Sequence, residues 1–249
     1  MSKKEKAALW AALVYMGIMM IGMYVMKHHF QINYDQPQMV SVLVYFMPFS
    51  AGSALIFYYK FFRGTAFKKL KLNFWIIEFF IAAIILAALQ IYFGNYQGKD
   101  MSLVWTIVGT TFMVGIGEEM LFRGIIFNAF KEKHGVYAAV LISAVIFGAL
   151  HITNILGGES LSKAIFQCCS AALTGIVFAW VYYKTENLIP TMLYHWVWDM
   201  FLILGLYVHV DQTASILMFQ NIFSIIASIV LLFICIKKII QAKKTTLKL

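Results

Sequence analysis

The chain has 249 residues, of which 62% are hydrophobic and 12% charged, with a formal net charge of +9. Soluble domains contain on average about 25% charged residues, so this composition excludes an ordinary soluble protein and is typical of a membrane protein. It also argues against a nucleic-acid partner, because the basic residues flank apolar stretches and form no compact basic domain.

Apolar stretches of about 20 residues recur along the chain, and each is long enough to cross the hydrocarbon layer of a bilayer as a helix. We therefore predict an all-α polytopic membrane protein, a bundle of about eight transmembrane helices embedded in lipid. Pro48 interrupts the second stretch, and the sixth carries Ser162, Lys163 and Gln167 at its start, which leaves a partly interfacial segment as the alternative for each. The expected spans are Ala8–Met26, Met39–Phe61, Phe74–Phe93, Leu103–Phe130, Val136–Ile155, Leu161–Tyr183, Leu188–Val208 and Ala214–Ile236.

Lysine and arginine are retained on the cytoplasmic side of short loops. If the N-terminus is cytoplasmic, sixteen of the 20 lysine and arginine residues fall on the cytoplasmic side of eight spans. We therefore expect a multi-pass protein of the cell membrane with both termini cytoplasmic. The chain shows no organelle-targeting features and looks bacterial. Its three cysteines, Cys168, Cys169 and Cys235, lie inside expected spans and predict no disulfide framework.

The fourth span carries three charged residues well away from its ends. At a rise of about 1.5 Å per residue, Glu118 lies roughly 18 Å from the inner end of the span, near the bilayer midplane. Arg123 follows Glu119 by four residues, so these two share a helix face and can neutralise each other. Glu118 is turned about 100° from that face. We assign Glu119 and Arg123 to architecture and Glu118 to chemistry.

Polar residues lie at similar depths in the fifth and seventh spans. His151 is roughly 22 Å from the inner end of its span, with Phe147 one turn before it and Asn154 three residues after it. His195 and Asp199 are roughly 10 and 16 Å from the inner end of theirs. Ionisable residues inside a membrane are rare and usually functional, so we predict that the three spans form one site.

Two chemical routes are open for this site. Two imidazoles and a carboxylate can bind zinc, which makes His151, His195 and Asp199 possible metal ligands. Alternatively, Glu118 activates water without a metal while His151 and His195 polarise the carbonyl. Both routes lead to hydrolysis. The H-E-x-x-H signature of soluble metalloproteases is absent, so its spacing cannot decide between them.

Three motifs resemble those of the CPBP family, which groups the type II CAAX prenyl endopeptidases with bacterial Abi proteins. They are the E-E-x-x-x-R motif within Gly117–Gly124, the F-x-x-x-H motif in Phe147–His151 and the H-x-x-x-N/D motif in His195–Asp199. The resemblance covers about Leu103–Leu204.

The resemblance also assigns roles. It implies that Glu118 activates water with His151 and His195 as partners, and that Glu119 and Arg123 support the site. Asp199 takes a position where eukaryotic members often have asparagine.

The resemblance predicts an intramembrane endopeptidase that cleaves a membrane-associated or lipidated peptide. The chain then divides into N-terminal helices (1–100), a catalytic core (101–208) and a C-terminal helix with a basic tail (209–249). One alternative is a non-enzymatic membrane scaffold or bacteriocin self-immunity factor that keeps the protease fold. Another is a proton-coupled transporter, which also uses carboxylates and histidines at the midplane but usually shows internal repeats.

Overall fold

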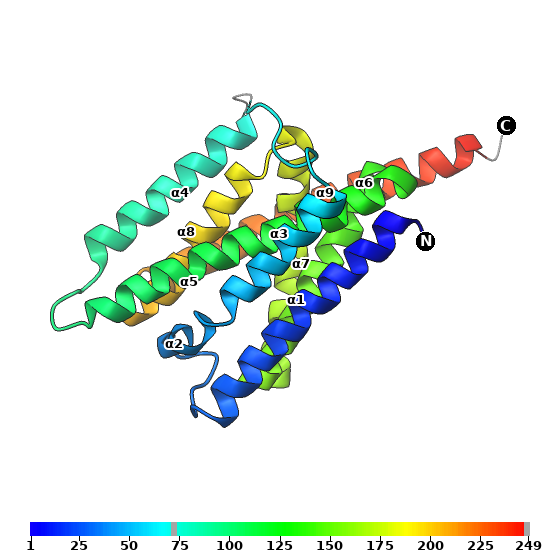
Figure 1. Cartoon of the computed structure of the whole chain (residues 1–249). Helices are drawn as coiled ribbons and strands as arrows, with labels where there is room; N and C mark the ends of the chain where they lie inside the picture. The colour runs from blue at the N-terminus through cyan, green and yellow to red at the C-terminus, as the bar shows by residue number, and fades with distance from the viewer. Residues whose placement is uncertain (71–73, 247–249) are drawn as a thin grey trace.

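The computed structural model describes residues 1–70 and 74–246, so Lys71 and Lys248, two of the basic residues counted above, lie outside the described residues. Within this part of the chain the structure is helical, with an isolated bridge between Phe67 and Asn187 and no β-strand (Figure 1). The predicted all-α, multi-pass fold is confirmed. The elements are α1 (Lys3–His28), η1 (Pro37–Met39), α2 (Val40–Leu43), α3 (Met47–Phe61), α4 (Phe74–Phe93), α5 (Met101–Glu119), η2 (Met120–Phe127), α6 (Asn128–Leu150), η3 (His151–Gly157), α7 (Leu161–Thr185), α8 (Ile189–Tyr207) and α9 (Thr213–Thr246).

Among the described residues, six helical stretches are long and apolar enough to cross a membrane, or seven when a bent pair counts as one span. One of the six, Met101–Gly157, has 57 residues and would be about 85 Å long if straight, far longer than a bilayer is thick. It reverses at Gly135, whose φ of 79° is outside the helical region. When the bent pair counts as one span, division of Met101–Gly157 at Gly135 raises the number of crossings among the described residues from seven to eight.

The reversal makes a tight antiparallel pair from the end of α5–η2 and α6. Ser143 Oγ donates a hydrogen bond of 2.8 Å to the Phe122 carbonyl, and the rings of Phe122 and Phe147 have centroids 5.1 Å apart. Glycine suits position 135, because other residues rarely adopt positive φ. This pairing places the fourth and fifth predicted spans side by side.

The second predicted span, Met39–Phe61, is broken close to Pro48, the residue expected to interrupt it. Its first part belongs to the helical segment Pro37–Leu43, which is η1 and α2, and its second part is α3; the two are bent by 60° relative to each other. Pro48 lies in the first turn of α3, where its missing N–H costs nothing, whereas a continuous helix would lose a hydrogen bond there. The fifth predicted span also needs correction, because its α-helix ends at Leu150 and continues as the 3₁₀ helix η3.

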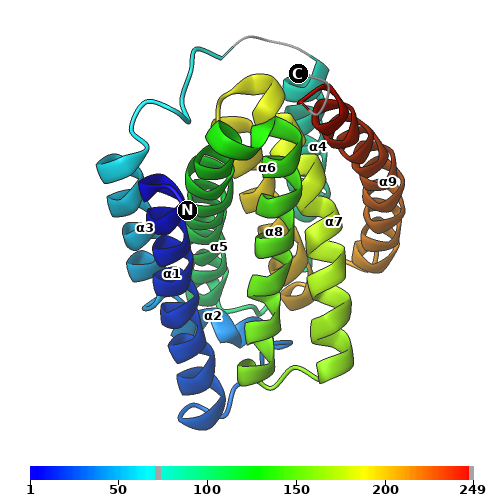
Figure 2. The ribbon, with the colours of Figure 1, turned by 90° about the vertical axis from the view of Figure 1, so that its right-hand side faces the viewer.

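The loops gather at two ends of the bundle. Ion pairs join Lys4 to Glu132 and both Lys68 and Lys131 to Glu186 at one end, which we call the basic end. The start of α1 and the end of α9 lie toward the same end, as Figures 1 and 2 show.

The other end, which we call the distal end, holds the loops 29–36, 94–100, 158–160 and 208–212. Tyr34 N donates to Gly157 O at 2.9 Å, and Asn95 N donates to Val208 O at 2.8 Å. Chain ends and loops therefore alternate between the two ends, as eight crossings require.

Small residues allow the helices to pack closely. A Cβ on Gly148 of α6 would lie 2.5 Å from the carbonyl oxygen of Cys168 on α7, and one on Gly115 of α5 would lie 2.9 Å from the backbone nitrogen of Trp196 on α8. Close backbone approach at glycine is typical of membrane helices.

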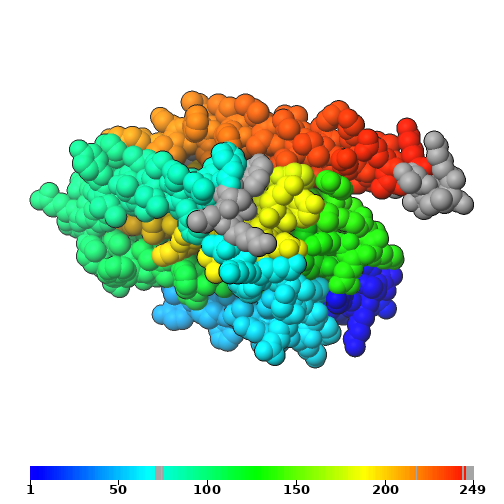
Figure 3. All heavy atoms as spheres, turned by 90° about the horizontal axis from the view of Figure 1, so that it is seen from above, coloured from blue at the N-terminus to red at the C-terminus, as the bar shows by residue number. Residues whose placement is uncertain are grey.

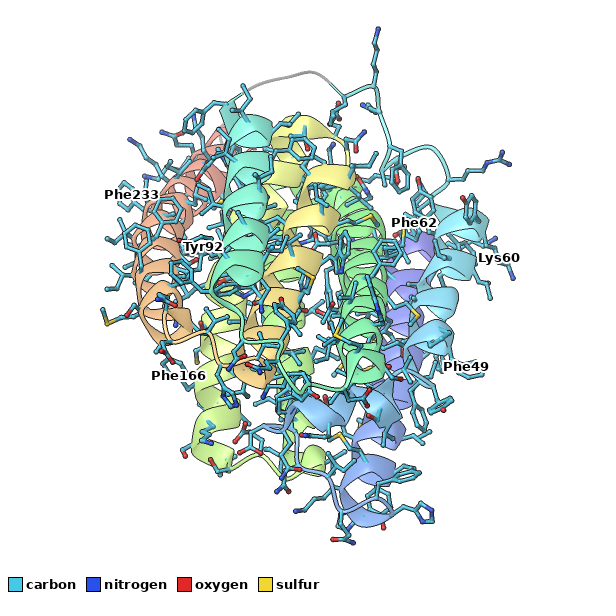
Figure 4. The ribbon with its side chains drawn as sticks, turned by 90° about the vertical axis from the view of Figure 1, so that its left-hand side faces the viewer. Phe49, Lys60, Phe62, Tyr92, Phe166 and Phe233 are labelled. Carbon is cyan, nitrogen blue, oxygen red and sulfur yellow. The ribbon has the colours of Figure 1, made fainter. Side chains whose placement is uncertain are left out.

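Large apolar side chains cover the outside of the bundle. Phe49, Tyr92, Phe166 and Phe233 stand outward in Figure 4, whereas Phe62 is buried. Helix α9 forms one long edge of the molecule (Figure 3). An apolar exterior of this kind suits contact with lipid.

Candidate active site

The centre of the site is the junction of α5 and η2. Glu118 and Glu119 are the last two residues of α5, and the chain then continues as a π-helix, Met120–Phe127. π-helical turns widen the backbone and occur frequently at functional sites. Both glutamates are buried, together with Arg123 in η2.

Arg123 is fully buried and makes contacts with three helices. Its Nη1 donates to Glu119 Oε1 at 2.8 Å, and its Nη2 donates to the carbonyl of Gly175 on α7 at 3.3 Å. Its guanidinium also lies over the ring of Phe147, 4.5 Å from the centroid. Burying a charge is costly unless it is paired, and here one ion pair, one hydrogen bond and an aromatic face replace part of the lost water, while Arg123 Nε has no hydrogen-bond partner.

Glu119 also fixes His195 of α8. The same Oε1 accepts a hydrogen bond of 2.9 Å from His195 Nδ1. Because a carboxylate can only accept, His195 must carry a proton on Nδ1 in this arrangement. The other ring nitrogen, Nε2, then faces Glu118 Oε2 at 3.8 Å and Asp199 Oδ2 at 3.4 Å.

Phe147 packs at the centre of these groups. Its ring meets His151 edge-on with centroids 5.3 Å apart and meets His195 edge-on at 5.9 Å. The same ring carries the Arg123 guanidinium described above. Phe147 therefore packs against the Arg123 guanidinium and both imidazoles and limits how either ring can turn.

His151 and Asn154 lie where α6 gives way to η3. His151 Nδ1 is 3.2 Å from the carbonyl oxygen of Phe147. A 3₁₀ helix has three residues per turn, so Asn154 stays in line with His151. Asn154 Nδ2 donates to Gln167 Oε1 at 2.8 Å, and Gln167 Nε2 donates to the Tyr34 hydroxyl at 3.2 Å.

A cavity of about 370 Å³ connects these groups. Glu118, His151, Asn154, His195 and Asp199 all contribute to its lining. The rest of the wall is largely apolar and comes mainly from α1, the segment 34–47, α5 and α8. Such a space, mostly apolar with a few converging polar groups, is the usual form of a ligand site.

A second cavity, of about 220 Å³, lies on the α7 and α9 side of the same groups. It is also lined by His151, His195 and Asp199, and its walls include Ser170 of α7 and Asn221 of α9. The two imidazoles and Asp199 therefore form a partition between two spaces.

The predicted zinc ligands lie around the first cavity but do not form a metal-binding group. Across residues 1–70 and 74–246, no set of three or more His, Cys, Asp or Glu side chains is placed to hold a metal ion. His151, His195 and Asp199 as arranged do not fit the tetrahedral site of zinc. Zinc binding by these residues stays a prediction.

The structure thus brings together every residue that the sequence singled out. Glu118, His151, Asn154, His195 and Asp199 meet at the cavity, while Glu119, Arg123 and Phe147 lie behind them. Sequence reasoning missed the contact between Glu119 and His195 and the link from Tyr34 through Gln167 to Asn154. Both join residues on separate elements, and a polar residue inside an apolar stretch, as at Gln167, was the signal available.

One of three comparisons with known proteins found a match. Residues 100–201 match the family model described as Type II CAAX prenyl endopeptidase Rce1-like. The match contains all three motifs and confirms the resemblance to the CPBP family. No curated protein and no solved structure matches the chain.

Proposed function

We propose, on the premise that residues 100–201 form an Rce1-like segment, that this protein is an intramembrane endopeptidase acting on a membrane-associated or lipidated peptide. One observation carries the proposal. Glu118, His151, His195 and Asp199 converge from three separate helices on one largely apolar cavity inside the bundle. A reaction that consumes water needs such a set of polar groups there, whereas structural packing does not.

In the proposed reaction, Glu118 is the general base. Its Oε2 lies 3.8 Å from His195 Nε2, so one water oxygen can lie within about 2.8 Å of both atoms. Glu118 takes a proton as the water oxygen bonds to the carbonyl carbon of the peptide. It then returns that proton to the leaving amine as the C–N bond breaks.

The two imidazoles stabilise the tetrahedral intermediate in this proposal. Negative charge develops on the carbonyl oxygen. Because Nδ1 of each ring already faces an acceptor, Glu119 or the Phe147 carbonyl, the donor in this proposal is Nε2–H of a protonated His151 or His195, in a site that excludes bulk water. Glu119 acts as a positioning residue, because its hydrogen bond to Nδ1 fixes the ring of His195. Asp199, 3.4 Å from His195 Nε2, orients that ring or the water beside it.

The test measures the rate at which the purified protein, in lipid vesicles, cleaves a membrane-associated or lipidated peptide. We expect Glu118→Ala to lower the rate by a factor of about 10² to 10⁴, the usual contribution of a general base. Glu78→Ala is the matched control, because Glu78 is a half-buried glutamate of α4 that lines neither cavity of the site. It should cleave normally, and helix content by circular dichroism should be equal in both variants.

Full activity of Glu118→Ala would refute the proposed mechanism. If no peptide is cleaved by the unaltered protein, and host cells with the triple Glu118, His151 and His195 alanine variant behave normally, the scaffold or self-immunity alternative holds instead. A comparison of peptide termini in host membranes with and without Glu118→Ala would identify the natural substrate.

A further inference from the structure

The cavity extends from the site toward one end of the bundle only. On α5 it is lined by Glu118 and by Val114, Thr111 and Thr110, which follow one another toward the distal end. On α8 the lining starts at His195 and continues to Leu206, again toward the distal end. No described residue on the basic-end side of Glu118 or His195 on these helices contributes to the wall.

The distal mouth of the cavity is formed by a segment that we call the strap, residues 29–39. Tyr34, Asp35, Gln36, Pro37 and Met39 line the cavity, and Asp35 and Gln36 are exposed. The strap is fastened to the site by the hydrogen bonds from Gln167 to Tyr34 and from Asn154 to Gln167, and by the bond from Tyr34 N to Gly157 O. The cavity entrance is therefore held by hydrogen bonds to α7 and η3, beside the candidate site.

The distribution of basic residues indicates which end of the bundle faces the cytoplasm. Of the 20 lysine and arginine residues, fourteen described ones lie in the chain segments toward the basic end, whereas three, Lys27, Lys99 and Lys163, lie near the distal end. The bias of basic residues toward the cytoplasm places the basic end inside. The cavity mouth then opens on the extracytoplasmic face.

We propose that the site is served from the extracytoplasmic side, so that water and the substrate peptide enter beneath the strap. This inference rests on the proposed peptidase function for the identity of the occupant and on charge for the orientation. A substrate that stays in the cytoplasm would meet the closed, basic end of the bundle.

The lining also selects the chemistry of the peptide. Its apolar part includes Met19, Met23 and Leu43, whereas its acidic groups are Asp35, Glu118 and Asp199. The described lining contains no lysine or arginine. A peptide segment with apolar side chains and neutral or cationic flanks is therefore accepted, and a carboxylate close to the scissile bond meets like charge without a basic partner.

Cysteine accessibility tests this inference without turnover. Cys168, Cys169 and Cys235 are first replaced by alanine, and Val114→Cys is introduced in the cavity, one turn from Glu118. A small membrane-impermeant methanethiosulfonate is added to right-side-out and to inverted membrane vesicles. We expect labelling of Val114→Cys in right-side-out vesicles and its loss in inverted ones. Lys133→Cys, exposed at the basic end, is the control and should show the reverse pattern.

A competition experiment tests the peptide class. A synthetic leucine and alanine peptide with lysine flanks should slow the labelling of Val114→Cys, and the same peptide with glutamate flanks should not. Labelling of Val114→Cys only in inverted vesicles, or equally in both, would overturn the proposed access route. Equal protection by the two peptides would overturn the charge preference. Because labelling needs no catalysis, these results stand apart from the Glu118→Ala comparison.

Discussion

Arg123 is the bulkiest of the fully buried side chains among the described residues, and its charge is held by one carboxylate, Glu119. The same carboxylate holds His195. Removing one partner of a buried ion pair leaves an uncompensated charge in a low-dielectric interior, which costs about 3–5 kcal/mol. A change at Arg123 therefore has two consequences, a loss of stability and a loss of order at His195.

A double-mutant cycle on this pair separates the two consequences. We expect Arg123→Met and Glu119→Gln each to lower the free energy of unfolding by about 3–5 kcal/mol. The double variant should lose less than the sum, because neither charge is then left alone, with a coupling of about 0.5–3 kcal/mol. Reversible unfolding in mixed micelles measures both. Glu119→Gln should also lower kcat more than it raises KM. Additive losses of stability would argue against the pair.

Metal removal tests the other predicted role of the polar residues. We expect cleavage to be unchanged after treatment with EDTA or 1,10-phenanthroline, because His151, His195 and Asp199 are not arranged as a set of metal ligands. The measurement is the cleavage rate before and after chelation, together with the zinc content of the purified protein. Loss of activity that returns on addition of zinc would establish the metal-assisted route.

Most residues of the candidate site could be predicted from the sequence, for a physical reason. A glutamate or histidine in an apolar stretch is costly, so Glu118, His151 and His195 stand out without any structure. The bond between Glu119 and His195 does not, because 76 residues separate its partners and no local period relates them. The spacing of four residues predicted the pair of Glu119 with Arg123. It gave no sign that the same Glu119 oxygen also accepts a hydrogen bond from His195.

Among the elements, α6 and α7 depend on a glycine at their closest approach. A Cβ at position 148 would lie 2.5 Å from a backbone oxygen and 2.7 Å from the Cβ of Ala172, so Gly148→Ala must push the helices apart. We expect it to destabilise the protein by about 1–3 kcal/mol, as overpacking does. Cleavage should fall as well, since Phe147 and His151 lie beside the contact.

Gly109→Ala is the matched control for that variant. Gly109 is also a helical glycine in a predicted span, but a Cβ there meets no atom within 4 Å. Alanine favours a helix over glycine by up to about 1 kcal/mol, so this variant should be as stable as the unaltered protein or slightly more stable. Thermal unfolding of the two variants checks the contrast. Equal stabilities would mean that the α6–α7 contact is looser than described.

Hydropathy predicts the helices well and their internal geometry poorly. Apolar content reports that a segment lies in the membrane, but it is insensitive to which carbonyl each N–H reaches. The π-helix η2, the 3₁₀ helix η3 and the 60° bend between α2 and α3 are all changes in hydrogen-bond register or direction. Only the bend had a signal in the sequence, Pro48.

At the scale of the whole molecule, the alternation of loops between two ends predicts the outcome of reporter fusions. Alkaline phosphatase becomes active only where its disulfides can form, outside the cytoplasm. We expect active fusions after Gln97, Glu159 and Asp211 and inactive ones after Gly64 and His134. An active fusion at the C-terminus of the full chain would contradict an even number of crossings with both ends inside.

The cavity wall has one more consequence, which concerns oxidation. Met19, Met23, Met39 and Met47 line the cavity and are otherwise buried, whereas Met20 and Met101 are exposed on the outside of the bundle. Peroxide converts the thioether of methionine into a polar sulfoxide. Damage to the exposed pair would leave peptide binding intact, while damage to the four buried residues would make an apolar wall hydrophilic. Oxidation that reaches these four residues would therefore weaken the binding of the apolar peptide proposed above and the packing of the core around it.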